Sequence, residues 1–114
     1  MPKTEHGNNA KNQLYNKYKR DSIRRDIDFN LTKPQFFRIT QKNCYYCNRS
    51  PKAVFKRKDR NSFYTYNGID RLNNNIGYTL KNSVPCCKRC NFAKCRLTEQ
   101  EFLDMVEEVY WNHF

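Results

Sequence analysis

The chain has 114 residues, which suits one domain of about 100–150 residues and excludes a second independent unit. Only 38% of the residues are hydrophobic, the mean hydropathy is −1.06, and no apolar run approaches the roughly 20 residues that cross a bilayer, so we expect no transmembrane helix. The net charge of +11 lies in residues 1–60, where 16 Lys and Arg outnumber 5 Asp and Glu, and this asymmetry favours a polyanion partner, most often nucleic acid, over a purely solubilising role.

The first ten residues are polar and lack the apolar core of a secretory signal. We therefore expect a disordered lead and a protein that stays in a reducing, intracellular compartment. From Ala10 to Ile27 the composition favours a helix, and Lys17, Arg20 and Arg24 fall on one face of it at positions i, i+3 and i+7. We expect this basic face to contact phosphate groups.

A second, shorter helix is predicted over residues 33–40. Its start is marked by Thr32 and Gln35, which fit the two ends of a capping box, where each side chain bonds the backbone N–H of the other residue. Its apolar contacts are supplied by three residues, Phe36, Phe37 and Ile39.

The middle of the chain predicts β structure. Residues 63–66, 69–72 and 78–80 favour strands, and residues 73–77 have the composition of a turn. We therefore expect a hairpin centred on Asn73–Gly77. Because Asn-Gly is itself a strong hairpin signal, an additional or shifted turn at residues 67–68 stays open.

The last segment predicts an acidic amphipathic helix. Thr98 can cap it, and Glu101 completes a capping box. Its apolar residues repeat at helical spacing: Phe102, Leu103, Val106, Val109 and Tyr110. An amphipathic stripe is more often part of a core than a partner-binding surface, so we expect this helix to pack on the domain.

Two C-x-x-C pairs, here called the first and second knuckle, are the strongest motif in the chain. They consist of Cys44 and Cys47 and, after 39 intervening residues, Cys87 and Cys90. Four sulfur ligands at this spacing predict a structural zinc ion with no open position, which in small peptides contributes about 10–16 kcal/mol of apparent folding free energy. Cys86 could replace Cys87 in a C-x-x-x-C arrangement, but two-residue spacing is the commoner geometry. Cys95 is expected to be a spare thiol.

The stretches 67–72, 77–79 and 82–94 resemble the HNH endonuclease family. The resemblance covers about residues 43–110 and is closest to a phage-type branch, with Gly-Ile-Asp-Arg where the common pattern has Asp-His. It implies a ββα-metal finger, in which two strands and a helix hold one divalent cation and the zinc knuckles tie the finger together.

The resemblance also assigns roles to single residues. Asp70 matches the acidic metal ligand on the first strand, Asn82 the central Asn that orients the general base, and Asn91 a metal ligand on the helix. Arg71 stands where the family has its general-base His. A guanidinium is not a base near neutral pH, so we expect Arg71 to clamp a phosphate, with a cation-bound hydroxide or the Tyr78 phenol as proton acceptor.

These observations predict a small α+β, zinc-stabilised ββα-metal domain, with residues 1–42 as a basic helical extension and residues 43–114 as the HNH-like domain. The expected function is hydrolysis of DNA phosphodiester bonds, with nicking, by means of Mg²⁺ or Mn²⁺. One alternative is a zinc-supported nucleic-acid-binding module that no longer cleaves, and another is a structural component that binds no nucleic acid. The residues expected on the DNA backbone are Lys17, Arg20, Arg24, Lys56, Arg57 and Lys58.

Overall fold

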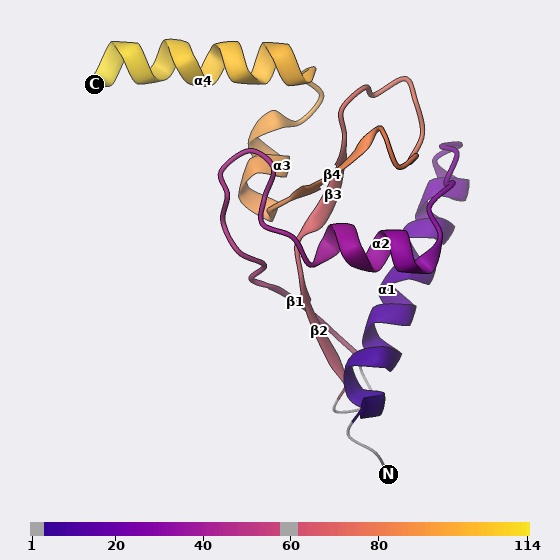
Figure 1. Ribbon diagram of the computed structural model, residues 1–114. Helices are drawn as coiled ribbons and strands as arrows, with labels where there is room; N and C mark the ends of the chain where they lie inside the picture. Colours follow the sequence, from indigo (N-terminus) through magenta and orange to yellow (C-terminus); the bar gives the residue numbers. More distant parts are fainter. Residues whose placement is uncertain (1–3, 58–61) are drawn as a thin grey trace.

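The computed structural model describes residues 4–57 and 62–114, which form four helices and four strands (Figure 1). In chain order these are α1 (Thr4–Arg24), α2 (Lys33–Thr40), β1 (Ala53–Lys56), β2 (Phe63–Tyr66), β3 (Gly68–Arg71), β4 (Ser83–Cys86), α3 (Lys88–Lys94) and α4 (Glu99–His113). No helix in this part of the chain is both long and apolar enough to cross a bilayer.

The strands form two separate antiparallel hairpins. In the first, Ala53 of β1 pairs with Tyr66 of β2, and in the second, Gly68 of β3 pairs with Cys86 of β4. Asn67 lies between β2 and β3, and its buried side chain donates hydrogen bonds to the carbonyl oxygens of residues 42 and 49. The Asn67-Gly68 pair is therefore the joint between two hairpins and not a hairpin turn of its own.

The second hairpin differs from its prediction. The expected return strand at residues 78–80 was wrong, because Tyr78 makes only a single bridge with Phe29, and its N–H donates to the carbonyl of Asp28. This contact draws Tyr78 toward the segment after α1 and lengthens the loop, so that Ser83–Cys86 becomes the partner of β3. Strand β1 was not predicted, since its residues were assigned only to phosphate contact.

The core is aromatic and lies where α1, α2 and the two hairpins meet. The Phe36 side chain is fully buried, and its ring meets those of Tyr15 and Tyr18 edge to face at 5.3 and 5.1 Å. Burial of such a ring contributes about 1.5–3 kcal/mol. Tyr64, Ile69 and Tyr78 also belong to this core, together with α1 residues. The core therefore contains residues of both predicted segments, 1–42 and 43–114.

The two N-terminal helices differ in how closely they follow their predictions. Helix α2 has the predicted bounds, and both bonds of the Thr32–Gln35 capping box are present. Helix α1 already begins at Thr4, so the disordered lead was wrong there, and it ends at Arg24 before the predicted Ile27. It ends because Asp26 adopts a left-handed conformation with φ 59° and the N–H of Ile27 donates to the carbonyl of Ser22, as in a Schellman motif.

Helix α4 has the predicted capping box of Thr98 and Glu101, but it does not pack on the domain. It projects from the end of α3 as a separate arm (Figure 1). Its first turn is held by Phe102, which is buried against the Tyr46 ring, and by a hydrogen bond from the Tyr45 hydroxyl to Glu99. All residues from 103 to 114 are exposed. The predicted packing was wrong because only the first turn of the apolar stripe meets the domain.

Candidate functional site

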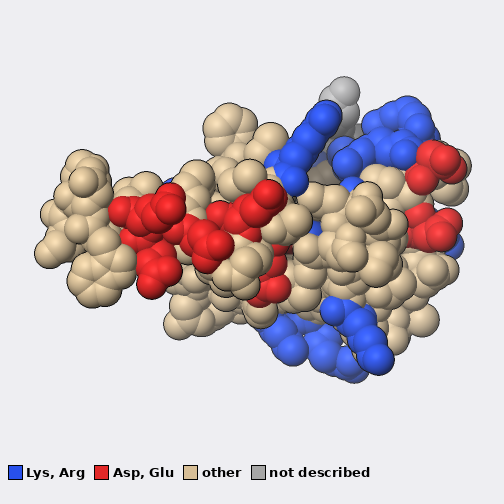
Figure 2. Space-filling view, turned by 90° about the horizontal axis from the view of Figure 1, so that it is seen from above, with Lys and Arg blue, Asp and Glu red and all other residues tan. Residues whose placement is uncertain are grey.

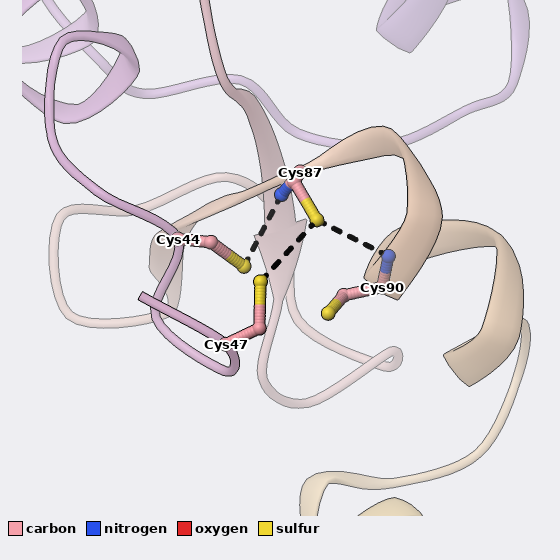
Figure 3. A group of neighbouring side chains, drawn as sticks. All are labelled: Cys44, Cys47, Cys87 and Cys90. Atoms are coloured by element: carbon pink, nitrogen blue, oxygen red, sulfur yellow. Dashed lines mark hydrogen bonds between the residues drawn. The ribbon is translucent and has the colours of Figure 1, made fainter. Parts of the chain in front are cut away.

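The four cysteines of the two knuckles converge from distant parts of the chain, as predicted (Figure 3). The Sγ atoms of Cys44, Cys47, Cys87 and Cys90 all lie within 4.8 Å of one another, and the distance from Cys47 Sγ to Cys87 Sγ is 3.7 Å. Four sulfurs about 2.3 Å from a tetrahedral zinc ion stand about 3.8 Å apart. The cluster therefore has the donor type and the spacing of a structural zinc site.

Backbone N–H groups and neighbouring thiols affect the ionisation of these sulfurs, which bind a metal ion as thiolates. The N–H of Cys87 lies 3.3 Å from Cys44 Sγ, and that of Cys90 lies 3.4 Å from Cys87 Sγ (Figure 3). Burial opposes ionisation of Cys47, but hydrogen bonds from the Arg49 backbone and the other three thiols outweigh it and lower its pKa to about 6. Burial raises the pKa of Cys90. Four thiols this close ionise together only when a cation offsets their charge.

The two remaining cysteines lie outside the cluster. Cys86 is buried at the end of β4, and burial raises the pKa of its thiol, so it behaves as an apolar side chain. Cys95 is exposed just after α3. The cluster contains Cys87 and not Cys86, in agreement with two-residue spacing in the second knuckle.

The cluster joins the second hairpin to α3. Cys87 is the N-cap of α3, and its side chain accepts a hydrogen bond from the N–H of Cys90. The first knuckle is tied to the same hairpin, because the N–H of Tyr45 donates to the carbonyl of Pro85 in β4. Strands β3 and β4 and helix α3 therefore form one hairpin-helix unit, hereafter the finger.

Asp70 lies in β3 at the centre of the finger and is buried. Its carboxylate oxygen Oδ2 lies 3.2 Å from Nζ of Lys94 and accepts a hydrogen bond from the Tyr46 hydroxyl at 2.8 Å. Lys94 has a completely buried side chain and also reaches Oδ1 of Asp70 at 3.4 Å. A carboxylate suits Mg²⁺, but here a buried ammonium already offsets its charge. The pair ties β3 to α3, and Tyr46 adds the first knuckle.

Asn91 opens onto a cavity of about 300 Å³ between the finger and α1, hereafter the Asn91 cavity. Tyr78 and Ile69 line it from the finger, and its other lining includes Lys17, Tyr18, Asp21 and Ser22 of α1 and Arg25 directly after that helix. Asn91 lies one helical turn before Lys94 on α3. The hydrogen bonds and ion pairs of residues 4–57 and 62–114 include none between Asp70 and Asn91.

Asn82 and Arg71 both hold the loop between β3 and β4. The amide oxygen of Asn82 accepts from the N–H of Asn73, and its amide nitrogen donates to the carbonyls of residues 73, 76 and 77. Nη1 of Arg71 donates to the carbonyls of residues 74 and 76, and the guanidinium lies 5.5 Å from the centre of the Tyr78 ring. Together the two side chains fix the loop that leads to Tyr78.

The residues predicted to contact DNA are spread over α1 and β1. Lys17 and Arg24 share Asp21, at 2.9 and 3.1 Å, whereas Arg20 has no carboxylate partner among the described residues. Lys56 is exposed, Arg57 is half-buried, and Lys58 lies outside the described residues. Figure 2 shows acidic side chains along the α4 arm and others at the opposite end of the molecule, whereas the Lys and Arg side chains in this view lie away from the arm.

Sequence reasoning missed two residues that shape the finger, Lys94 and Tyr46. Lys94 ends the pattern Cys-x-x-Cys-Asn-x-x-Lys, and its place one turn after Asn91 was a usable signal that it faces β3. Tyr46 gave no such signal, since its contact with Asp70 joins residues 24 positions apart.

The comparisons with known proteins bear mainly on the fold. No family model matches the chain. It is 38% identical over 107 residues to an uncharacterized protein of Acanthamoeba polyphaga mimivirus, and the match covers 94% of this chain but only 18% of the viral protein. Among solved structures it is similar to the rare-cutting HNH restriction endonuclease PacI, with a TM-score of 0.63 and 19% identity over 87% of this chain and 75% of that one. The predicted fold is thereby confirmed: the chain is a small HNH-like α+β domain.

Proposed function

We propose that this domain is a divalent-metal-dependent nuclease that nicks DNA. The observation that carries the proposal is the finger itself, in which β3, β4 and α3 are joined at the four-cysteine cluster and Asn91 faces a cavity whose lining includes Lys17 of α1 and Arg25 directly after it. Lys17 is paired with Asp21 at that cavity, and Arg25 leaves it with a net positive charge, which suits a phosphate beside Asn91.

The proposal assigns chemical or structural roles to the polar residues of the finger and of its loop. Asn91 and Asp70 would hold Mg²⁺ or Mn²⁺. Asp70 would do so only after its ion pair with Lys94 is broken. The cation would polarise the scissile phosphate and stabilise the leaving oxygen. Asn82 keeps the loop in place, and the part of the Arg71 guanidinium beyond Nη1 can contact a phosphate.

The proton acceptor is a separate question, because Arg71 cannot serve as the base. The Tyr78 side chain lines the same cavity as Asn91, which supports a role for it near a phosphate bound there. We propose that the Tyr78 side chain, in its phenolate form, takes the proton of the attacking water. A divalent cation held by Asn91 and Asp70 would supply the alternative, because it would lower the pKa of water bound to it.

A plasmid assay tests the proposal. In Mg²⁺ or Mn²⁺ the native chain is expected to convert supercoiled plasmid to the open circle, and Asn91→Ala to lower that rate by about 100-fold or more, since a metal ligand is lost. Asn112→Ala, in the exposed last turn of α4, is the matched control and is expected to nick normally. Equal rates for the two variants would remove Asn91 from the mechanism.

The buried Asp70–Lys94 pair specifically favours a second candidate, a nucleic-acid-binding module that does not cleave. In that case Asp70 is purely structural, and its charge stays compensated by Lys94. Mn²⁺ binding followed by electron paramagnetic resonance separates the two candidates. A nuclease binds Mn²⁺ and loses it in Asp70→Asn, whereas the module retains DNA binding and takes up no Mn²⁺ beyond any held by the cysteines.

A further inference from the structure

A second cavity, of about 220 Å³, lies beside the four-cysteine cluster and is strongly basic. Among the described residues, its lining includes four cationic residues and no acidic one: Arg49, Lys52, Lys88 and Arg89, with Ala53, Asn67 and Cys87. The stretch 52–58 was predicted from the sequence to position the DNA backbone, and of its described residues only the first two line this cavity. We call it the knuckle cavity, because Arg49 follows the first knuckle and Lys88 and Arg89 lie within the second.

In the part of the chain that the structure describes, no carboxylate forms an ion pair with the cations of the knuckle cavity. The ion pairs of the described residues involve Asp21 and Asp70, and neither of these lines the cavity. Four thiolates around one Zn²⁺ carry a formal charge of about −2, which offsets about half of the four cationic side chains. Lys52, Lys88 and Arg89 are moreover exposed to solvent. The remaining positive charge is accessible to an anion.

We propose that the knuckle cavity binds a backbone phosphate of the nucleic acid, next to the phosphate held at Asn91. The proposal rests on the proposed function and names a second contact on the same substrate. Arginine forks bind phosphate oxygens in pairs, and lysines add point charges, so this set of side chains has the chemistry of a phosphate site.

Helix α3 connects the two contacts. Lys88 and Asn91 are three residues apart on α3, a rise of about 4.5 Å along the helix axis. Residues three apart are neighbours on the surface of a helix, with about 5–6 Å between their Cβ atoms. A strand that follows α3 can therefore place one phosphate at Asn91 and a neighbouring phosphate at Lys88 and Arg89.

Because the cationic residues sit on the two knuckles, the cavity exists only while both knuckles are held together. The carbonyl of Arg49 accepts the N–H of Cys44, and Asn67 donates to the same carbonyl. These bonds fix the backbone of Arg49 opposite the start of α3. The four-cysteine cluster thus positions a charged surface as well as the finger.

The test measures binding of a fluorescent DNA duplex of about 20 base pairs by anisotropy, without divalent cations, from about 50 to 200 mM salt. Lys88→Gln/Arg89→Gln is compared with Arg38→Gln/Lys81→Gln, which removes the same charge from exposed side chains that line neither cavity. The first variant is expected to bind about tenfold more weakly and to lower the salt slope by about 0.9, the value for one lost phosphate contact. The control is expected to change less.

Zinc content is measured in every variant, because Lys88 and Arg89 lie between two zinc ligands. If their replacement lowers the zinc content, Lys52→Gln, which lies outside both knuckles, becomes the deciding variant and is expected to weaken binding in the same direction. A variant that keeps its zinc and binds like the control overturns the proposal and leaves these cations to offset thiolate charge only.

The outcomes also separate this inference from the proposed function. A native chain that binds DNA through the knuckle cavity but never nicks plasmid keeps the inference and removes the nuclease. A native chain that nicks plasmid, while the knuckle variant binds like its control, removes the inference alone. If the native chain binds no duplex at any salt concentration, both are wrong.

Discussion

Asp70 and Lys94 form an ion pair that is buried on both sides, with side chains 8% and 0% exposed. Removal of two charges from water costs several kcal/mol for each ion, so such a pair persists only with good geometry and extra hydrogen bonds. The Tyr46 hydroxyl supplies one of these bonds to Asp70. The pair therefore specifies how β3, α3 and the first knuckle fit together.

Lys94→Met tests this structural role. The substitution leaves the Asp70 carboxylate buried without a cation and is expected to lower the free energy of unfolding by about 3–5 kcal/mol. Lys94→Met combined with Asp70→Asn is expected to recover part of that loss, because no charge then remains buried. Urea unfolding of the zinc-loaded proteins measures both, and a double variant less stable than Lys94→Met would contradict the pairing.

Tyr46 gives the fold a sensitivity to high pH. Burial, and then its hydrogen bond to Asp70, raise the pKa of Tyr46 above its ordinary value of 10.0. Below pH 10 this phenol is neutral in both states and contributes no pH dependence. Above pH 10 the unfolded chain ionises it and the folded chain does not, so stability is expected to fall as pH rises.

Thermal unfolding between about pH 8 and pH 11 measures this effect. Tyr46→Phe removes the ionising group and is expected to flatten the loss of stability above pH 10. Tyr110→Phe, at an exposed position of α4, is the matched control and should leave the profile unchanged. Profiles that coincide for Tyr46→Phe and the native chain would exclude Tyr46 as a source of the effect.

Among the secondary-structure elements, helix α4 is attached to the domain through its first turn. Phe102 is 4% exposed, whereas Trp111 and Phe114 are 69% and 87% exposed. We therefore expect Phe102→Ala to cost about 3 kcal/mol and a chain that ends after residue 102 to lose less than about 1 kcal/mol. Denaturant unfolding of the two variants makes the comparison, and a larger loss for the truncated chain would mean that the arm packs on the domain in solution.

Helix boundaries were predictable where they depend on residues close together in the sequence. The capping boxes at Thr32 and Thr98 place two helix starts correctly, because each depends on residues only three positions apart. The partner of β3 and the direction of α4 depend on contacts between distant residues, such as Tyr78 with Asp28 and Tyr46 with Phe102. No local pattern encodes such contacts, so the hairpin register and the packing of α4 were predicted wrongly.

In the candidate site, too, the features that depend on local spacing were predictable and those that depend on distant contacts were not. The cysteine spacing was sufficient to choose the four residues that converge, because two-residue knuckles restrict the geometry strongly. The partners of Asp70 and the two cavities depend on how α1, α3 and the knuckles come together. Residue spacing alone cannot give those distances.

For the molecule as a whole, the α4 arm is acidic, and the rest of the chain has a net positive charge although it also carries acidic side chains (Figure 2). Replacement of Lys17, Arg20 and Arg24 by Glu is expected to weaken binding to unrelated DNA sequences alike and to lower the salt slope, because phosphate contacts carry no sequence information. Anisotropy titrations with two unrelated duplexes measure this. An unchanged affinity for both would assign the basic face of α1 another role.

The central claim is that four cysteines hold one zinc ion that joins the two knuckles and thereby builds the finger. Elemental analysis of the purified protein tests it most directly, together with circular dichroism of two cysteine variants. We predict about one zinc per chain, lost with the fold in Cys87→Ser and retained in Cys95→Ser. A native protein that is folded and free of tightly bound zinc or any other transition metal would contradict the claim.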